Sequence, residues 1–526
     1  MNLTTDAWIP TVRMDGKPEM VSLLDAFHRG HELRDLAVRP HERIALMRLL
    51  ICVAQAALDG PADFDVWEAC CPRIAPAALE YLKHWQPAFE LFGDGQRFLQ
   101  VANLKKAAGK VDEADEEGSS SSKLDLALAT GNNTTLFDNA GGSSRGFDEA
   151  RLALNLVTFQ CFAPCGTIGV ALWNGTPTLG WNSYPEAKPG KSSHAPCLSG
   201  NLLHSYLRGS NLLDSLHSNL VAKEQVGKFC GPDAWGMPIW ERMPSSAVDE
   251  GAARNASHSY LGRLVPLSRA IRLTADRQTM TLANGLEYPA YPEWREASAT
   301  IVTRPRKNQP TRVTLAASAD RGVWRELNAL TVLGVGRDSV GGPVALRNVA
   351  DEVAFDLWVG GLIAKGNGKL VDTTESVFHV PAAMLTDGGQ RLYEDGVRLA
   401  GDWARRLRWA IFVYHQKRAD NAEHAVVPEQ CGRMQGNAEA QFWTDIEQDV
   451  ALLLEVVAAP ESLGLPAEWH RTPWGRSVRR AAQAAYESAC PHETPRQIRA
   501  YVLGRRALFA APVEEPVART RKGAEE

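Results

Sequence analysis

The chain has 526 residues, of which 44% are apolar, with a formal net charge of −5 and 9 cysteines. This apolar content suffices for one large core and a second domain, and the missing basic excess excludes a protein that binds nucleic acid through global charge alone. Contact with DNA or RNA therefore needs local basic patches or partner subunits. Scattered cysteines, no apolar run near the roughly 20 residues of a membrane span and no recognisable signal peptide predict a cytoplasmic protein without a membrane partner.

Strand and helix patterns alternate in the first hundred residues. Residues 7–12 are predicted as a short strand and residues 41–58 as a helix with one buried face. The apolar residues at helical spacing on that face are Ile44, Met47, Leu50, Ile51 and Ala54. Residues 107–123 are acidic and then serine-rich, which is typical of a mobile surface insertion.

The rest of the chain has two regions with different sequence patterns. From about residue 124 to residue 310, short apolar runs are broken by Gly, Pro, Asn and Trp, and residues 299–304 and 311–317 are predicted as strands. Beyond this region, two apolar stripes and two further helical patterns predict four helices of about four to six turns. The two stripes are Trp403, Leu407, Ala410, Ile411 and Tyr414, then Phe442, Ile446, Val450, Leu453 and Val457, and the further helices cover residues 474–488 and 495–509.

These patterns together predict the α+β fold class. A large mixed α/β domain is expected over residues 1–380, with the insertion at 107–123 on its surface. An antiparallel four-helix bundle is expected over residues 381–511, followed by a flexible tail at 512–526.

No enzyme motif in the chain is complete. The stretch GKS at residues 190–192 ends like a phosphate-binding loop, but Pro185 stands where the first glycine belongs, and Lys369 lacks that glycine as well. Cys161 and Cys165 have no second pair at metal-binding spacing and are predicted as buried free thiols. The sequence thus predicts no catalytic residue, no metal and no cofactor, and favours a binding or scaffolding subunit.

Several short motifs occur in a characteristic order along nearly the whole chain. They are MNLTTDAWIPTV at the start, RFLQV at 97–101, TGNNTTLFDNAGG at 130–142, FAPCGTIG at 162–169, YLRGSNLL at 206–213, NGLEYP at 284–289 and LWVGGLIAKGNGKLVD at 357–372. In order and spacing they resemble the CasA family, the large subunit of the type I-E CRISPR surveillance complex Cascade.

The resemblance implies a function and a set of partners. The family has a mixed α/β domain followed by a four-helix bundle, in agreement with the pattern above. It inspects the protospacer-adjacent motif on double-stranded target DNA and starts strand separation, so that the guide RNA can pair. The implied partners are the guide RNA, the other Cascade subunits, the target DNA and a separate type I helicase-nuclease.

Two segments of the chain resemble functional loops of the family. The loop at residues 130–142 resembles the family's loop near the guide RNA handle, where amides and one aromatic ring suit RNA contact. Its candidate residues are Asn132, Asn133, Phe137 and Asn139. Residues 163–169, here called the glycine loop, occupy the place of the loop that enters the DNA minor groove. Its candidates are Cys165, Gly166, Thr167, Ile168 and Gly169, and the Thr-Ile pair departs from glycine-richer members; a plain surface loop and a plain tight turn remain the alternatives.

A basic finger and a wedge are implied as well. The finger candidate is Arg277, with Arg272 as its rival, because arginine suits a narrow electronegative groove. The wedge candidates, which surround a predicted turn, are Lys365, Asn367, Gly368 and Lys369. Lysines there would contact phosphates while the asparagine acts at the fork between the strands. An exposed strand arginine and an exposed turn are the plainer readings.

Basic faces on the predicted bundle leave more than one interpretation open. They contain Arg405, Arg406, Arg408, Arg476, Arg479 and Arg480, which suit DNA, a neighbouring subunit or simply solvent. Two alternatives to the CasA-like function also stay open. One is a nucleotide-dependent hydrolase or nuclease that uses the region around Lys365 and Lys369, and the other is a purely structural scaffold.

Overall fold

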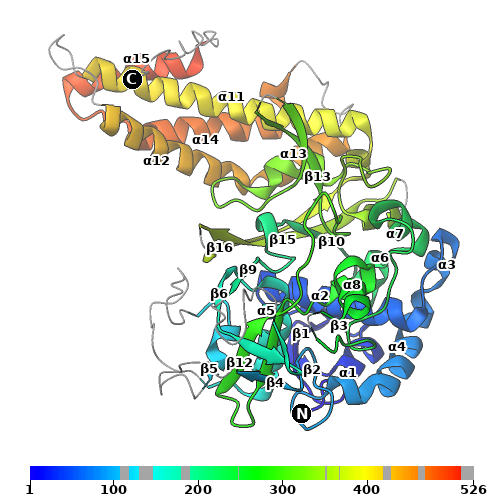
Figure 1. The fold of residues 1–526 in the computed structure, drawn as a ribbon. Coiled ribbons are helices and arrows are strands. Elements are labelled where there is room, and N and C mark those ends of the chain that lie inside the picture. The colour runs from blue at the N-terminus through cyan, green and yellow to red at the C-terminus, as the bar shows by residue number, and fades with distance from the viewer. Residues whose placement is uncertain are drawn as a thin grey trace. The chain divides into compact units, whose positions relative to one another are not determined.

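The computed structural model describes residues 1–106, 118–128, 146–178, 190–246, 248–307, 309–349, 352–366, 368–418, 428–459 and 468–510. The chain forms two compact units, unit 1 over Met1–Val380 and unit 2 over Pro381–Glu526. Unit 1 mixes helices with small sheets and unit 2 is helical, so the predicted α+β class is confirmed (Figure 1). Within the described ranges, no helix has the length and apolar character needed to cross a bilayer.

Ten helices belong to unit 1. They are α1 (Leu23–His28), α2 (Pro40–Leu58), α3 (Phe64–Ala69), α4 (Cys71–Trp85), α5 (Glu149–Phe162), α6 (Leu212–Asn219), α7 (Lys223–Cys230), α8 (Glu250–His258), α9 (Tyr260–Leu264) and α10 (Leu327–Leu330) in the described chain. The central one is α2, which packs against α4, α5 and α9 and is buried along most of its length. The predicted helix is therefore present, but it is buried on several faces rather than one.

Polar residues of α2 are buried because each has a partner. Arg48 donates from Nη1 to Glu296 Oε2 at 2.9 Å. Gln55 donates to the carbonyl oxygen of Val221 at 2.6 Å. A charged or amide side chain in a core is tolerated when its hydrogen bonds are satisfied, so periodicity of apolar residues alone underestimates how deeply this helix lies.

The strands of unit 1 form small antiparallel sheets. Their orders are β2 (Pro18–Val21)–β1 (Ile9–Arg13)–β3 (Leu33–Leu36), β4 (Leu104–Lys106)–β7 (Ala171–Trp173)–β8 (Thr176–Pro177), β11 (Arg269–Leu273)–β12 (Thr279–Asn284)–β5 (Ser119–Ser120), β6 (Gly166–Ile168)–β9 (Gly190–Ser192), β13 (Ile301–Arg306)–β14 (Gln309–Thr314) and β10 (His204–Arg208)–β15 (Phe355–Lys365)–β16 (Lys369–Val380). The strands expected near residues 7–12, 299–304 and 311–317 correspond to β1, β13 and β14.

The longest pairing is the hairpin of β15 and β16. Its register runs from Phe355 opposite Val380 to Lys365 opposite Lys369, with an irregularity between Ile363 and Ala364. Residues 365–369, here called the hairpin tip, close it. Gly366 and Gly368 of the tip have φ values of 58° and 84°, a backbone region that glycine adopts without strain.

The serine-rich end of the expected mobile insertion is ordered, which corrects that expectation for residues 118–123. Ser119 and Ser120 form β5 and pair with β12. Ser121 is fully buried, and its hydroxyl donates to the carbonyl oxygen of Arg277 at 2.7 Å. Serine hydroxyls bond readily to nearby backbone, so a serine run can be structured without large apolar side chains. The acidic half, residues 107–117, lies outside the described residues.

Unit 2 consists of α11 (Asp387–Arg418), α12 (Pro428–Glu447), α13 (Val450–Ala458), α14 (Pro473–Ala489) and α15 (Pro495–Phe509) in its described part. The last two confirm the predicted helices, and α11, with 32 residues, is longer than expected. The second apolar stripe is buried as predicted, yet it spans two helices. The break falls at Asp449, whose carboxylate accepts from Arg480 of α14 at 3.2 Å.

Candidate nucleic-acid interface

The glycine loop leaves the C-terminal end of α5 and continues into a strand. Cys165 donates its backbone N–H to Nδ1 of His194 at 3.0 Å. Gly166 then starts β6, which pairs with β9. Gly166, Thr167 and Gly169 are exposed. Cys161 is a buried free thiol as expected, whereas the free thiol Cys165 is only half-buried, because it lies where the chain leaves the core.

Neither exposed glycine of this loop is required by the packing of the described residues. A Cβ added at Gly166 or Gly169 would have no other atom within 4 Å, and neither residue has a left-handed φ. A larger side chain would therefore fit both positions in the chain by itself. Glycine at such positions leaves the backbone accessible for close approach by another molecule.

The hairpin tip lies against the glycine loop. Gly368 is buried, and a Cβ there would come within 2.9 Å of the Cys165 carbonyl oxygen and 3.1 Å of Pro164 Cβ. Lys365 and Lys369, which face one another across the tip, are exposed. Asn367 lies outside the described residues. Two segments that are about 200 positions apart in sequence therefore meet, because only glycine permits this contact.

Arg269 fixes the base of the glycine loop. It is 4% exposed and donates to the carbonyl oxygens of Pro164 and Ser193, each at 2.8 Å, and of Ser268 at 2.7 Å. Burial lowers the pKa of Arg269 to about 10. The pKa of His194 is also lowered, by burial and then by the charge of Arg269, which favours the neutral ring that accepts from Cys165.

Sequence reasoning missed Arg269. An arginine in an otherwise apolar strand usually indicates an exposed position, and two of the three carbonyls that Arg269 contacts belong to segments far away in sequence. The only usable signal is its place in β11, the strand that also carries the finger rival, Arg272.

Arg277 does not lie beside the glycine loop. It occupies the turn between β11 and β12 with a φ of 66°, and its guanidinium makes an ion pair with Glu149 at 2.6 Å. Glu149 begins α5, whereas the glycine loop follows the other end of that helix. Because α5 has 14 residues, the two ends are about 21 Å apart. Arg272 lies within β11 and is half-buried.

The loop candidates lie outside the described residues; they are Asn132, Asn133, Phe137 and Asn139. Ion pairs connect the chain before this segment to the chain after it. Asp125, before the segment, makes ion pairs with Arg151, after it, at 2.9 Å and with Arg39 of α2 at 2.8 Å. Arg151 also contacts Glu42 of α2 at 2.8 Å. Burial acts to raise the pKa of Asp125, yet the arginines hold it below its usual value.

The bundle arginines contact other residues of unit 2. Arg405 and Arg480 make ion pairs with Asp402 and Asp449. Arg406 and Arg479 lie over the rings of Trp403 and Phe509 at 5.2 and 5.1 Å, Arg408 is 3.9 Å from Glu439, and Arg476 donates to the carbonyl of Arg471. These contacts fit solvated helix faces and leave the choice between DNA and a partner subunit open.

Comparison with known proteins gives the class of the chain and its family. A solved Cse1 structure from Thermobifida fusca has a TM-score of 0.75 with 22% identity and covers 97% of each chain. A structure described as a CRISPR RNA-guided surveillance complex has a TM-score of 0.70 with 18% identity, covering 97% of this chain and 99% of the other. At these identities the likeness establishes the fold, that of CRISPR-associated proteins with a mixed α/β part and a helical part.

The sequence itself establishes the family. The family model of CRISPR-associated protein Cse1 matches residues 2–485. A curated CRISPR-associated protein CasA/Cse1 from Thermus thermophilus is 26% identical over 430 residues, which cover 77% of this chain and 76% of the relative. The chain belongs to the Cse1 family, the CasA family of type I-E Cascade, and the resemblance seen in its motifs is confirmed.

Proposed function

We propose that this protein is the large subunit of a type I-E Cascade complex and recognises DNA without catalysing a reaction. In this function it reads the protospacer-adjacent motif through the minor groove and starts duplex unwinding for guide RNA pairing. A separate helicase-nuclease then acts on the opened DNA. Membership of the Cse1 family supports this function.

The contact between the hairpin tip and the glycine loop is the observation that carries the proposal. Gly368 packs on Pro164 and Cys165, so the segment that reads the groove and the segment that opens the duplex touch. A motif bound at the glycine loop then sets the first base pair beside the tip. Recognition of the motif can therefore lead directly to strand opening, because the glycine loop and the hairpin tip form one surface.

The exposed glycines suit the groove by size. A minor groove about 6 Å wide accepts backbone more readily than bulky side chains. Gly166 and Gly169 have open space where a Cβ would stand, so DNA can approach their backbone. The half-buried Ile168 and the exposed Thr167 lie between them, and we assign them and Cys165 to the same contact.

At the tip, the two exposed lysines contact phosphates and Asn367 acts at the fork. Lys365 and Lys369 are opposite each other in the register, so each can face one strand of a separating duplex. Inserting a side chain between stacked bases costs a few kcal/mol, which phosphate contacts on both sides offset. Arg277 has a secondary place in this proposal, as a contact to DNA farther from the motif.

The loop at residues 130–142 anchors the subunit to the guide RNA and to the rest of the complex through Asn132, Asn133, Phe137 and Asn139. The ion pairs of Asp125 and Arg151 support this role, because they fix both flanks of the loop on α2. An anchor of this kind needs fixed ends, since an untethered loop would lose affinity to its own ordering entropy.

The test is strand opening by the assembled complex after Asn367→Ala and Gly368→Ala are introduced together. We expect intact assembly, opening of duplex targets at least about tenfold slower, equivalent to about 1.4 kcal/mol at the barrier, and little change on targets opened beforehand. The matched control is Asp15→Ala with Gly16→Ala in the β1–β2 turn, where Gly16 has a φ of 82°, similar to Gly368. Duplex opening at the wild-type rate would refute the wedge.

A further inference from the structure

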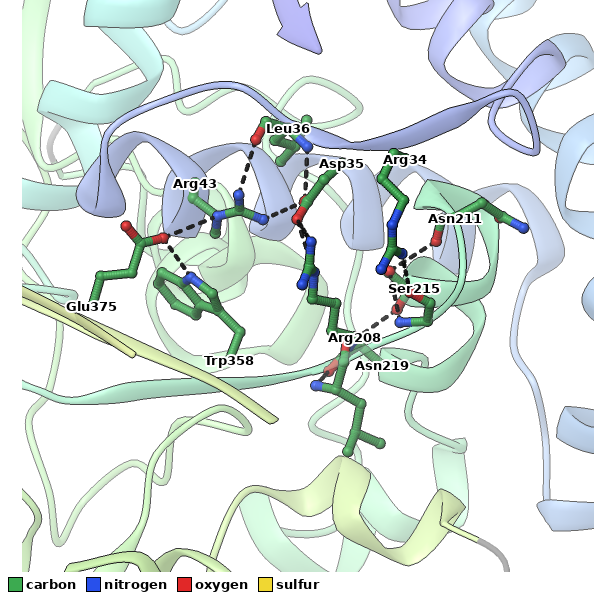
Figure 2. A network of polar contacts seen from close by, with 12 residues as sticks. Arg34, Asp35, Leu36, Arg43, Arg208, Asn211, Ser215, Asn219, Trp358 and Glu375 are labelled. Atoms are coloured by element: carbon green, nitrogen blue, oxygen red, sulfur yellow. Dashed lines mark hydrogen bonds and ion pairs between the residues drawn. The ribbon is translucent and has the colours of Figure 1, made fainter. Parts of the chain in front are cut away.

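Arg43, from outside the β15–β16 hairpin, contacts it close to the place where its pairing with β10 ends, here called the root of the hairpin (Figure 2). Arg43 of α2 lies 3.5 Å from Glu375 Oε1 of β16 and 5.6 Å from the ring centre of Trp358 on β15. Trp358 donates from Nε1 to the same carboxylate oxygen at 2.6 Å. One guanidinium therefore contacts both strands, and we call these three side chains the root contacts.

The root contacts are themselves fixed to the core of unit 1. Arg43 donates to the Leu36 carbonyl oxygen at 2.9 Å and pairs with Asp35 of β3. Asp35 also accepts from Nε of Arg208 at 2.9 Å, and Arg208 belongs to β10, the strand beside β15 (Figure 2). Arg43 is 13% exposed at its side chain, so solvent screens these charges less than it screens a surface pair.

A second contact lies near the tip. Asn201 accepts from the backbone N–H of Ala364 at 2.9 Å and donates to the Ala364 carbonyl oxygen at 3.1 Å. One amide thus satisfies both backbone groups of a residue in β15, as a neighbouring strand would. Ala364 adjoins the irregularity in the register, three positions before Asn367.

This second contact replaces a missing strand. The pairing of β10 with β15 ends at His204 opposite Gly360, so the five residues from there to Lys365 extend about 17 Å without the third strand. A two-stranded hairpin by itself is only marginally stable in water. Asn201 therefore adds to the packing of Gly368 on Pro164 and Cys165 in holding the end of the hairpin that carries the tip.

The backbone around Asn201 is shaped for this contact. Asn201 has a φ of 53°, a left-handed conformation that asparagine adopts more readily than most residues. The following residue, Leu202, brings its carbonyl oxygen within 3.0 Å of a Cβ added at Gly361. A left-handed backbone at a residue other than glycine persists only where surrounding contacts hold it. At Asn201 these contacts are its hydrogen bonds to Ala364 of the hairpin.

We propose that Arg43 and Asn201 are positioning residues for strand opening, which hold the β15–β16 hairpin rigid at its root and near its tip. The inference rests on the proposed function of the tip as a wedge. A wedge separates bases only if the load is borne by the core rather than absorbed by bending of the hairpin. The root contacts set the direction of the hairpin, and Asn201 sets the place of the tip against the glycine loop.

The experiment uses Asn201→Ala and Asn201→Asp for the near-tip contact and Glu375→Gln for the root. Aspartate keeps the acceptor and loses the donor, and glutamine keeps the acceptor for Trp358 while it removes the charge opposite Arg43. The matched controls are Asn174→Ala, since Asn174 also has a positive φ of 49° and bonds a backbone carbonyl, and Glu32→Gln in the Arg29 pair. Each variant is studied in the assembled complex.

The experiment has two readouts, hydrogen exchange at the tip and DNA opening. A merely structural role would impair binding to duplex and opened targets alike. We expect hydrogen exchange of peptides covering the tip to rise about tenfold in the three variants, with exchange in α2 unchanged. Opening of duplex DNA should slow by a similar factor, whereas binding to targets opened beforehand should stay within about twofold. The controls should leave both readouts unchanged.

The outcomes distinguish this inference from the function on which it rests. If the Asn367 and Gly368 variant slows opening but the Asn201 and Glu375 variants do not, the positioning inference is wrong and the wedge stands. Faster exchange at the tip without slower opening likewise overturns it. If the tip variant itself opens duplex DNA normally, the proposed function fails first. Equal losses on duplex and opened targets would indicate a folding defect and overturn the inference.

Discussion

Alanine in place of the exposed glycines of the glycine loop should weaken DNA binding without lowering the stability of the fold. At Gly166 and Gly169 a Cβ meets no atom within 4 Å and the backbone is not left-handed. Gly→Ala at such a site stabilises a protein by about 0.4–1 kcal/mol, because it restricts the unfolded chain. Gly368 is the opposite case, with a φ of 84° and a Cβ 2.9 Å from the Cys165 carbonyl oxygen, so Gly368→Ala should cost about 1–3 kcal/mol.

The assay compares urea unfolding of the full chain with duplex binding by the assembled complex, for each of the three variants. We expect Gly166→Ala and Gly169→Ala to unfold at or slightly above the wild-type midpoint and yet to bind motif-bearing duplex at least about tenfold more weakly, since a methyl group enters a groove about 6 Å wide. A stability loss above about 1 kcal/mol for Gly166→Ala would refute the open packing. Unchanged binding for both would refute the groove contact.

Two further predictions concern His41, a buried histidine of α2, and Arg269, at the base of the glycine loop. Burial, and then the charge of Arg39, lower the pKa of His41 from 6.5 to about 4. As the pH falls, the unfolded chain therefore binds a proton at His41 before the folded chain does. The stability is fully present above pH 6.5, and about 2 kcal/mol of it is lost by pH 5. In urea unfolding, the difference in stability between pH 7.5 and pH 5.0 should be smaller for His41→Phe than for the wild type. Arg269→Lys keeps the charge but replaces the two guanidinium nitrogens that reach the three carbonyls by one ammonium nitrogen. We therefore expect a loss of about 1–3 kcal/mol and faster hydrogen exchange at Cys165, and an unchanged rate at Cys165 would count against the role of Arg269.

The elements that the sequence predicted well are those set by local rules. The helices expected at residues 474–488 and 495–509 begin at Pro473 and Pro495, and each follows a threonine whose side chain caps the first turn. The break at Asp449 was not visible because the apolar spacing continues through it. At the break this carboxylate accepts from Ser477 and Arg480 of α14, contacts that the apolar spacing does not reveal.

The candidate site was predictable in its parts and not in its assembly. The resemblance to the CasA family marked the glycine loop, whereas glycines beside lysines drew attention to the tip as a place where backbone and charge suit phosphate. That Gly368 rests on Cys165 follows only from the three-dimensional path of two distant segments. Arg269 and Asn201 act through backbone carbonyls and amides, which leave no trace in the sequence of their partners. Arg277 was chosen as the nearest candidate for the family's basic finger, and its distance from the glycine loop depends on the length of α5.

The packing of α2 on β15 has a consequence for biosynthesis. Arg43 contacts Glu375, so the helix at the start of the chain is completed by residues more than 300 positions later. At about 5–20 residues per second, a ribosome needs roughly 15–60 s to synthesise that interval. During this time the apolar surface of α2 has no final partner on that side. Unit 1 is thus expected to fold late on the ribosome, and chaperone occupancy of nascent chains should fall only after Val380 has emerged.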